Sequence, residues 1–334
     1  MRIYVGFITY GESTAKYLPY FLPSLKAQTF KDLKILAIDN TEEEDNKNSR
    51  YLKNYPEIDF KWAGGNLGFA RAYNKMINEA LAGGAKYFLA LNPDMAAEAD
   101  MAEKLVKVME RDDKAGAVMP KILKWDFANK TKTDRIDSLG LAVNRGFRFF
   151  DKRQGEIDDG KMKEAEEVFG FTGAAVLLRL SVLKDVAYEG KEFFDELMFM
   201  YKEDCDLSLR LRLGGWKIFL EPNAVVCHDR TASAPESGVW RIVKSRLKKE
   251  RRIKKWSFLN QMILFSKYKK LPLSFYSKSA IFFHCLKRIL FALFFEPYLI
   301  KELFKFRGMR KEIKKRRDQL KIRVNIREFE KFMK

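Results

Sequence analysis

Residues 86–94, with the sequence KYFLALNPD, constrain the fold more than any other stretch of the chain. Residues 87–91 form a continuous apolar run, which is typical of a strand buried on both faces of a parallel sheet. The run ends at Asn92, Pro93 and Asp94, because proline cannot donate to a strand ladder and a carboxylate cannot stay buried without a partner. We therefore expect these polar groups at the carboxyl end of a central strand, where ligands bind in open α/β sheets and an aspartate can hold a divalent cation. A simple turn would also explain the tripeptide if it stood alone.

The charge of the chain is divided unevenly along its length. Of the 334 residues, 64 are Lys or Arg and 45 are Asp or Glu, which gives a formal net charge of +19. Residues 241–334 carry 29 of these cations and 7 of these anions, so residues 1–240 hold a net charge of −3. We therefore predict two domains, a slightly acidic α/β domain over residues 1–240 and a basic C-terminal region over residues 241–334.

Two features bear on the cellular location. The N-terminal sequence MRIYVGFITYGES contains no apolar segment long enough for a signal peptide. The three cysteines, Cys205, Cys227 and Cys285, are an odd number without metal-site spacing, so we expect free thiols in a reducing compartment. Both features favour a cytoplasmic protein.

A β-α-β unit is predicted at the N-terminus. Residues 2–10 are β-branched and aromatic, apolar residues then recur at helical spacing up to about residue 28, and residues 34–38 form a second strand. Because a helix crossing joins two parallel strands, the strand ends should lie beside each other. We therefore expect Thr9, Tyr10 and Asp39 to face one crevice.

A glycine-rich turn follows the third predicted strand, which covers residues 58–63. The turn GGNLGFA places Gly68 where backbone can approach a ligand, and the helix after it, through residue 82, presents free N–H groups to an anion. The spacing matches neither a dinucleotide fingerprint nor a P-loop, and a tight turn capped by Asn66 explains it nearly as well.

The middle of the chain is less regular. A helix is predicted over about residues 99–111 and a strand around residues 116–119, but residues 124–163 hold no strong period. Long connections of this kind tend to be binding loops or lids. Residues 168–179 predict a strand that another group approaches closely at Gly173.

Three acids crowd the start of the next predicted helix. The helix dipole accounts for one or two of Glu203, Asp204 and Asp206, but three within four residues repel one another unless a cation or a substrate hydroxyl lies nearby. For Asp206 we favour a salt bridge with Arg210, one helical turn away.

Taken in order, these motifs resemble glycosyltransferase family 2, the inverting enzymes of the GT-A fold, and most of all its rhamnosyltransferase-like branch. The resemblance covers about residues 1–235 and depends on the order of the motifs, because each motif is generic. The motifs are Thr9-Tyr10, Asp39-Asn40, Asn66-x-Gly68-Phe69-Ala70 with Asn74, Asn92-Pro93-Asp94, Thr172-Gly173-Ala174, Glu203-Asp204-x-Asp206-Leu207 with Arg210, and His228. The resemblance implies the GT-A fold of nucleotide-diphospho-sugar transferases, a Rossmann-like α/β domain with a mixed sheet flanked by helices.

The same resemblance implies roles for individual residues. Thr9, Tyr10 and Asp39 would hold the base and ribose of the nucleotide, since a carboxylate can accept the imide N–H of uracil or thymine. In the Glu203-Asp204 motif, Asp204 would be the general base and Glu203 would support it, because direct displacement with inversion needs one carboxylate near the acceptor hydroxyl. The nucleotide sugar would lie beside further residues of these motifs, namely Asn66, Gly68, Asn74, Asn92 and Gly173.

A metal site is implied as well. The Asp-x-Asp motif of the family falls on Asn92-Pro93-Asp94, where an amide replaces the first acid, so Asp94 would be the main metal ligand. His228, which closes a predicted strand in polar company, resembles a later histidine that completes the metal shell in some members. Mg²⁺ or Mn²⁺ bound there would bridge the diphosphate and neutralise the charge of the leaving group.

The basic C-terminal region mixes aromatics and leucines with lysine at helical spacing. Its longest apolar candidate, residues 280–300, is interrupted by His284, Lys287, Arg288 and Glu296, which argues against a membrane-spanning helix. We expect amphipathic helices that lie on an anionic membrane surface, at the inner face of the cell membrane and near a lipid-linked acceptor. The alternative is that their apolar side packs on the first domain or forms a homodimer contact.

These expectations combine into an inverting, metal-dependent glycosyltransferase. It would move a sugar from a dTDP- or UDP-linked donor, first of all rhamnose from dTDP-rhamnose, to a polysaccharide or lipid-linked acceptor. A nucleotidyltransferase acting on sugar phosphates is one alternative, but residues 11–13 lack the phosphate-binding basic loop that such enzymes usually have. A nucleic-acid-binding protein would use the basic region and leave residues 1–240 without a role, so we expect no nucleic-acid partner.

Overall fold

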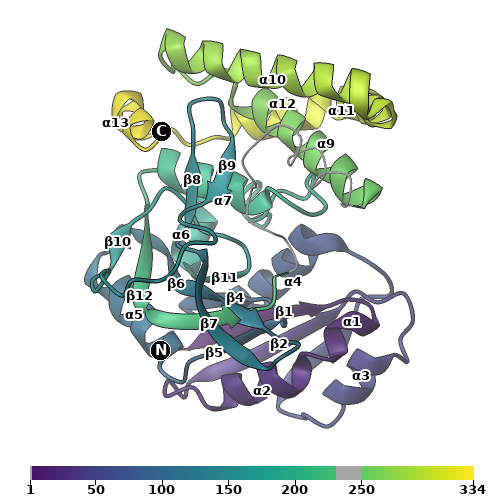
Figure 1. Cartoon of the computed structure of the whole chain (residues 1–334), viewed down its shortest axis with the longest axis vertical. Coiled ribbons are helices and arrows are strands. Elements are labelled where there is room, and N and C mark those ends of the chain that lie inside the picture. Colours follow the sequence, from purple (N-terminus) through teal and green to yellow (C-terminus); the bar gives the residue numbers. More distant parts are fainter. Residues whose placement is uncertain (1, 231–249) are drawn as a thin grey trace.

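The computed structural model of the chain describes residues 2–230 and 250–334. Figure 1 shows a sheet with flanking helices in the lower part of the molecule and the C-terminal helices across its upper end. The predicted boundary between the two domains, at residues 240 and 241, lies outside the described residues.

Strands and helices alternate in the first ninety residues, as predicted. Four parallel strands lie in the order β4-β1-β2-β3, which puts the buried run of residues 87–91 inside the sheet. Every residue of β4 is buried, which confirms the interpretation of that run. The elements are β1 (Ile3–Thr9), α1 (Glu12–Ala15), α2 (Leu18–Lys26), β2 (Leu33–Asp39), α3 (Lys47–Leu52), β3 (Ile58–Trp62), α4 (Gly68–Ala82) and β4 (Tyr87–Leu91).

The second half of this domain makes the sheet mixed. Strand β11 runs antiparallel to both β4 and β6, and β12 is parallel to β6 and antiparallel to β5. The strand predicted over residues 168–179 is shorter and begins at Ala175. The elements are β5 (Met95–Ala97), α5 (Met101–Arg111), β6 (Ala115–Asp126), β10 (Glu166–Glu167), β11 (Ala175–Arg179), α6 (Leu180–Val186), α7 (Glu203–Leu213) and β12 (Lys217–His228).

The prediction of an irregular stretch over residues 124–163 is wrong. This segment contains β7 (Thr131–Ser138), which pairs with the end of β6, and a two-stranded sheet of β8 (Leu141–Val143) and β9 (Phe149–Asp151). The first five residues of β7 are exposed or half-buried and the last three are buried, so the strand shows no regular alternation. The other two strands have only three residues each, too few to produce a period.

The C-terminal region is helical, as predicted. Its elements are α9 (Arg251–Tyr268), α10 (Phe275–Phe295), the short 3₁₀ helix η1 (Pro297–Leu299), α11 (Ile300–Gly308), α12 (Arg310–Asp318) and α13 (Ile326–Lys331). Within residues 2–230 and 250–334, no helix has both the length and the apolar character needed to cross a membrane. All three cysteines are free thiols, as expected.

Two large hydrophobic cores and a small cluster of Tyr17, Trp125 and Cys227 are formed by the described residues. The first fills the space between the sheet and the helices that pack on it, including α2, α4, α5 and α6. The second joins Leu209 and Leu213 of α7 to Phe258, Met262 and Phe265 of α9, so the C-terminal region shares a core with the first domain.

Candidate active site

The carboxyl ends of β1 and β2 lie side by side, with Thr9 directly opposite Asp39. Both side chains are buried, and Thr9 Oγ1 donates a hydrogen bond of 2.9 Å to Asp39 Oδ1. That oxygen also accepts from the Thr41 hydroxyl at 2.6 Å, and Asp39 Oδ2 accepts from the Asn46 amide at 2.6 Å. Asp39 therefore holds the loop of residues 41–46, and contact between this carboxylate and a nucleobase would require the loop to move.

Tyr10 borders the same crevice and contacts the C-terminal region. Its side chain interacts with Arg252, and this interaction together with Glu250 raises the pKa of the Arg252 guanidinium. Arg252 belongs to the first turn of α9. The start of α9 therefore lies beside the predicted nucleotide end of the site.

The glycine-rich turn before α4 packs closely against the backbone of another segment of the chain, at Phe199. Asn66 Oδ1 accepts from the Gly68 N–H at 2.9 Å, so the capping interpretation of Asn66 describes its contact. Gly68 has a φ of +77°, and a Cβ there would lie 2.7 Å from Phe199 Cδ2 and closer still to the Phe199 carbonyl oxygen. That oxygen accepts from the Phe69 N–H at 2.9 Å. The glycine is thus required by the segment around Phe199, which precedes the three acids of α7.

Asn74, which lies further along α4, also contacts the segment before α7. Its buried side chain makes four hydrogen bonds, all with residues of the loop before α7: it donates to Phe194 O and Glu196 Oε1 and accepts from the N–H groups of Phe193 and Phe194. These bonds use both donors and the acceptor of the amide. Asn74 therefore fixes this loop, and its predicted place beside the sugar nucleotide stays a prediction.

Asp94 and His228 come together at the end of the central strand. His228 closes β12, which pairs with β5 in a register that puts His228 opposite Met95. The distance between His228 Nε2 and Asp94 Oδ1 is 3.2 Å. Asp94 Oδ1 is shielded from solvent and accepts no hydrogen bond of normal geometry from any residue of the described ranges.

The second ring nitrogen of His228 is held by an acid from another strand. Nδ1 lies 2.9 Å from Oδ2 of Asp137, which is buried at the end of β7. Burial disfavours the charged imidazolium, but the carboxylates of Asp94 and Asp137 outweigh burial and raise the pKa of His228 to about 9. A histidine whose Nδ1 is fixed by a carboxylate has Nε2 oriented as a ligand, and Asp94 adds an oxygen ligand. No group of three or more His, Cys, Asp or Glu side chains in the described part of the chain has metal-binding geometry.

Sequence reasoning missed Asp137, Asp151 and Arg230. Arg230 Nη1 is 2.7 Å from Asp151 Oδ2 and 3.7 Å from Asp137 Oδ1. Both acids lie in the segment that was expected to be irregular. Asp137 stands between Ile136 and the mostly apolar sequence SLGLAV, and this was a usable signal, because a carboxylate among apolar residues needs a partner.

The predicted base lies at a strained turn. Tyr201 and Lys202, which precede α7, have φ values of +71° and +72°, a region that non-glycine residues rarely occupy. The half-buried Asp204 accepts from the Gly173 N–H with Oδ2 at 3.0 Å and from the Cys205 N–H with Oδ1 at 2.7 Å. These two donors fix the orientation of its carboxylate.

Glu203 sits in a different environment from its neighbour. It is 4% exposed, and its Oε2 accepts no hydrogen bond from the residues that the structure describes. Burial, together with the charge of Asp204, raises the pKa of Glu203 well above the ordinary value of glutamic acid. Of the two adjacent carboxyl groups, Asp204 is the more exposed and has both oxygens oriented by backbone N–H groups, so it is the better placed to meet an acceptor hydroxyl.

The third acid of the cluster, Asp206, is satisfied by cations. Arg210 Nε lies 2.9 Å from Asp206 Oδ2, which confirms the predicted salt bridge. Lys267 of α9 adds a second cation, with Nζ 2.5 Å from Asp206 Oδ1, and the Tyr268 hydroxyl donates to the same oxygen at 2.8 Å. This buried network connects α9 directly to the helix that carries Asp204.

Asp94 and Asp204 share one edge of the sheet. The residues 173 and 174 connect them, since Gly173 N–H bonds Asp204 and Ala174 O accepts from the Asn92 N–H at 2.8 Å. Burial lowers the pKa of Arg230, but Asp151, Asp137 and, to a smaller extent, Asp204 raise it overall, so Asp204 lies within electrostatic reach of the same cluster. Acids from the turn after β4 and from β7, β9 and α7 therefore gather in one place.

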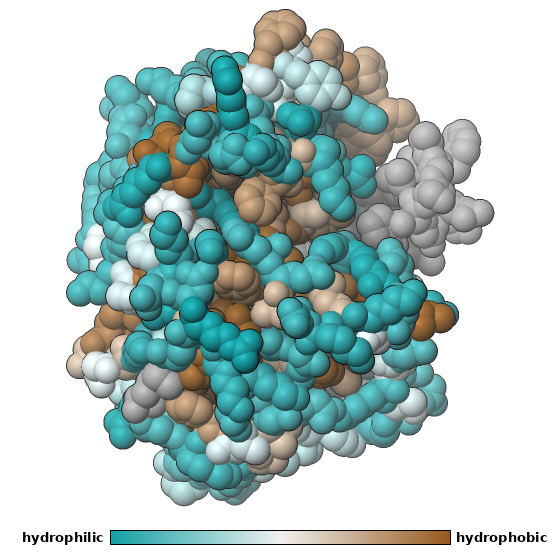
Figure 2. All heavy atoms as spheres, turned by 90° about the vertical axis from the view of Figure 1, so that its left-hand side faces the viewer, coloured by the Kyte–Doolittle hydropathy of each residue, from teal (hydrophilic) through white to brown (hydrophobic). Residues whose placement is uncertain are grey.

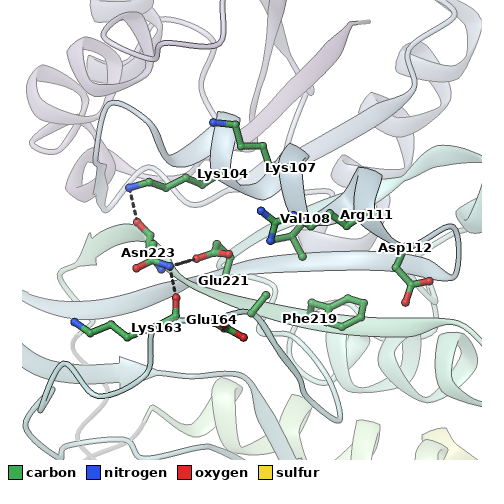
Figure 3. Close-up of a pocket in the computed structure, with 11 residues that line it drawn as sticks. Lys104, Lys107, Val108, Arg111, Asp112, Lys163, Glu164, Phe219, Glu221 and Asn223 are labelled. Carbon is green, nitrogen blue, oxygen red and sulfur yellow. Dashed lines mark hydrogen bonds between the residues drawn. The ribbon is translucent and has the colours of Figure 1, made fainter.

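Two cavities lie away from this cluster. Figure 3 shows one of about 750 Å³ between α5, β12 and residues 163–165, where Lys104 donates to the Asn223 carbonyl oxygen at 2.8 Å. Another, of about 380 Å³, lies between β2, β3 and α4. Neither cavity is lined by a predicted site residue. We therefore locate the candidate site from the contacts between its side chains and not from a cavity.

Comparison with protein families gives two matches. The model described as glycosyl transferase family 2 matches residues 4–186, and the model described as glycosyl transferase family group 2 matches residues 97–301. Among curated proteins, the chain is 28% identical over 239 residues to an N-acetylglucosaminyl-diphospho-decaprenol L-rhamnosyltransferase of Mycobacterium tuberculosis, in two strains. The match covers 68% of this chain and 75% of that enzyme.

Solved structures share the fold at low sequence identity. Staphylococcus aureus TarS superimposes with a TM-score of 0.55 at 14% identity. The match covers 96% of this chain and 53% of the TarS chain. GalNAc-T7 with UDP, GalNAc and Mn²⁺ gives a TM-score of 0.53 at 14% identity, with coverages of 81% and 52%. A mannosyltransferase of Pyrobaculum calidifontis with GDP-Man and Mn²⁺ gives 0.50 at 15% identity, with coverages of 91% and 73%. The chain thus spans about half the length of the first two of these structures.

Proposed function

The chain belongs to glycosyl transferase family 2, and from that premise we propose that it transfers a sugar with inversion from a nucleoside diphosphate donor to an acceptor hydroxyl, with Asp204 as the general base. The observation that carries this assignment is the setting of Asp204. Its carboxylate is partly exposed, is oriented by two backbone N–H groups, and lies at the sheet edge where Asp94 and His228 meet.

The residues of the chain support a direct displacement. The acceptor hydroxyl attacks the anomeric carbon from the face opposite the diphosphate, the new C–O bond forms as the bond to the diphosphate breaks, and the hydroxyl proton passes to Asp204. Glu203 is 4% exposed, so it is less accessible to the acceptor hydroxyl than Asp204. General-base catalysis of this type contributes about 10²- to 10⁴-fold to the rate.

For the donor and the acceptor, we propose dTDP-rhamnose and a lipid-linked glycan. The support is the 28% identical relative, whose name is that of a rhamnosyltransferase acting on a diphospho-decaprenol-linked sugar. The alternative donor is a UDP-linked sugar, and the alternative acceptor is a polysaccharide. The location of the protein at the inner face of the cell membrane stays a prediction.

We also propose that Asp94 and His228 hold Mg²⁺ or Mn²⁺. The support is the shielded Asp94 Oδ1, which lies 3.2 Å from His228 Nε2, the fixed ring of His228, and the presence of Mn²⁺ in two of the similar solved structures. When bound, the ion supplies neutralisation of the charge on the departing diphosphate.

The test is a panel of sugar nucleotides incubated with the purified full chain and Mn²⁺, scored by thermal stabilisation and by transfer. Asp204→Asn should reduce transfer about 1000-fold while leaving donor-induced stabilisation nearly unchanged, because the amide keeps its shape but cannot accept the proton. Asp113→Asn, at an exposed aspartate without a described partner, is the matched control and should transfer at the normal rate. In the same panel Asp94→Ala should weaken the Mn²⁺-dependent part of donor stabilisation. Normal transfer by Asp204→Asn would show that the base has been assigned to the wrong residue.

A further inference from the structure

Helix α10 carries a concentrated apolar surface. Of the fifteen exposed large hydrophobic side chains in the described residues, ten fall within residues 275–304. Phe282, Phe283 and Phe294 are 62%, 64% and 72% exposed, values that are high for phenylalanine in a folded chain. Figure 2 shows hydrophobic side chains gathered at the upper end of the molecule, the end that α10 occupies in Figure 1. We call this set the α10 face: Phe275, Tyr276, Phe282, Phe283, Leu286, Leu290, Leu293, Phe294, Phe295 and Phe304.

Cations surround the α10 face. Lys278 and Lys287 are exposed on α10 itself, and neither forms an ion pair with a described residue. The following helices, α11 and α12, carry further exposed cations that are also unpaired within the ranges described, namely Lys301, Arg307, Arg310, Lys311 and Lys314. Aromatic and leucine side chains beside unpaired lysines and arginines form a surface complementary to anionic lipid headgroups and the acyl chains beneath them.

The opposite side of α10 packs close to the candidate active site. His284 Nδ1 lies 2.6 Å from the Gly146 carbonyl oxygen, and Arg145 donates to Ser277 Oγ at 3.3 Å. Burial lowers the pKa of Lys202, and the nearby charge of Arg288 on α10 lowers it further. Lys202 directly precedes Glu203 and Asp204. The α10 face is therefore on one side of α10, and the start of the helix that carries the base is near its other side.

We infer that the α10 face docks onto the surface of an anionic lipid bilayer, with its aromatic and leucine side chains in the interface and its lysines among the headgroups. Packing against the first domain accounts for α9, whose Phe258, Met262 and Phe265 are buried, and for the opposite side of α10, but it leaves the α10 face exposed. Docking by α10 does not depend on the enzyme chemistry. Its consequence, that a lipid-linked acceptor meets Asp204 close to the leaflet, rests on the proposed function.

Vesicle flotation of the full chain tests docking without donor or acceptor. The wild type should float with phosphatidylcholine vesicles that contain phosphatidylglycerol and much less with phosphatidylcholine alone. The triple variant Phe282→Ser, Phe283→Ser, Phe294→Ser should lose at least about tenfold in partitioning, since three exposed aromatic rings no longer enter the interface. The matched control, Ile157→Ser with Ile322→Ser, changes exposed apolar residues outside the α10 face and should float like the wild type.

A charge variant separates the two components of binding. Lys278→Gln with Lys287→Gln should reduce partitioning by about thirtyfold on vesicles with phosphatidylglycerol, at about 1 kcal/mol for each of the two cations near the surface, and should change little on phosphatidylcholine. Equal flotation of the wild type and the triple variant would overturn the inference. So would light scattering that shows a wild-type dimer, a monomeric triple variant and no vesicle binding, because a second copy would then cover the α10 face.

Transfer assays with a water-soluble acceptor distinguish docking from the proposed function. The triple variant should transfer to such an acceptor at the wild-type rate, because none of the changed residues belongs to the candidate active site. Vesicle binding by a wild type that transfers no sugar would refute the proposed function and leave docking in place.

Discussion

Replacement of Lys267 by methionine tests whether the C-terminal region is part of the catalytic domain. Lys267 is fully buried in α9, and its ammonium contacts Asp195 in the loop before α7 and Asp206 in α7. Lys267→Met keeps a chain of similar length and removes the charge, so two buried carboxylates lose a shared cation. The effect should appear as a loss of stability of the whole chain.

The size of the loss follows from the contacts that remain. Removing one partner of a buried ion pair typically costs about 3–5 kcal/mol. Asp206 keeps Arg210 at 2.9 Å and Asp195 keeps Arg316 at 2.9 Å, so we expect the lower value, about 3 kcal/mol. For 334 residues unfolding together, the entropy of unfolding is about 0.7 kcal/mol per kelvin, which converts that loss into a decrease in Tm of about 4 °C.

The pH dependence gives a second, independent check. Burial raises the pKa of Asp206, but Lys267 and Arg210 outweigh burial and hold it below its ordinary value. A carboxyl with a lowered pKa in the folded state stabilises the fold above its unfolded pKa, near 4, and this contribution is lost as the pH falls through the folded pKa. Without Lys267, fewer cations counteract the effect of burial, so the pKa of Asp206 should be higher in the variant. The loss of stability relative to the wild type should therefore be largest above about pH 6 and shrink towards about pH 4.

Scanning calorimetry across this pH range measures both effects. Lys270→Met changes an exposed lysine just beyond α9 that has no described ion-pair partner, and its Tm should stay close to that of the wild type. A deficit in Lys267→Met no larger than in this control, or one that grows as the pH falls, would contradict the reasoning.

Two further predictions concern the site. Gly68→Ala should destabilise the fold by about 1–3 kcal/mol more in chemical denaturation than Gly84→Ala, because both glycines have positive φ but only Gly68 has a neighbouring segment that a Cβ would meet. In the metal-free protein, imidazole NMR resonances should show His228 titrating near 9 and His284 near 4, since burial lowers the pKa of His284. Asp137→Asn should lower the pKa of His228 by about one to two units and leave His284 unchanged. Because the folded pKa of His228 is raised, its stabilising contribution is present below about pH 6.5 and is lost as the pH rises through about 9.

The strands that the sequence predicted are those whose burial leaves a local pattern. The apolar run of β4 and the β-branched run of β1 are buried on both faces, and each is flanked by turn residues. Strand β7 starts with exposed polar residues beside β6 and becomes buried only at Ile136. Pairing with β6, and not the composition of the segment, therefore makes it a strand. Short-range patterns cannot supply that information.

The candidate site divides in the same way. Family resemblance selected Asp94 and His228, and the structure brings them within 3.2 Å. Asp137 is 91 residues from His228 in sequence, so its contact with the ring is visible only once β7 is placed. The resemblance placed Gly68 and Asn74 beside the nucleotide sugar, which stays a prediction. Both also contact the segment before α7, and a sequence pattern cannot reveal that contact.

Helices α9 and α10 show why composition alone could not assign the C-terminal region. Both mix phenylalanine, leucine and lysine at helical spacing, and from the sequence either could pack on the domain or lie on a membrane. The partners of α9 lie far away in the chain: Asp195 and Asp206 neutralise its Lys267, and Leu209 and Leu213 cover its apolar side. Because an unpaired buried lysine is costly, these distant acids allow α9 to be the buried helix. No such acids face Lys278 and Lys287 among the described residues, so α10 keeps both its cations and its apolar face at the surface, which is the arrangement that an anionic bilayer can bind.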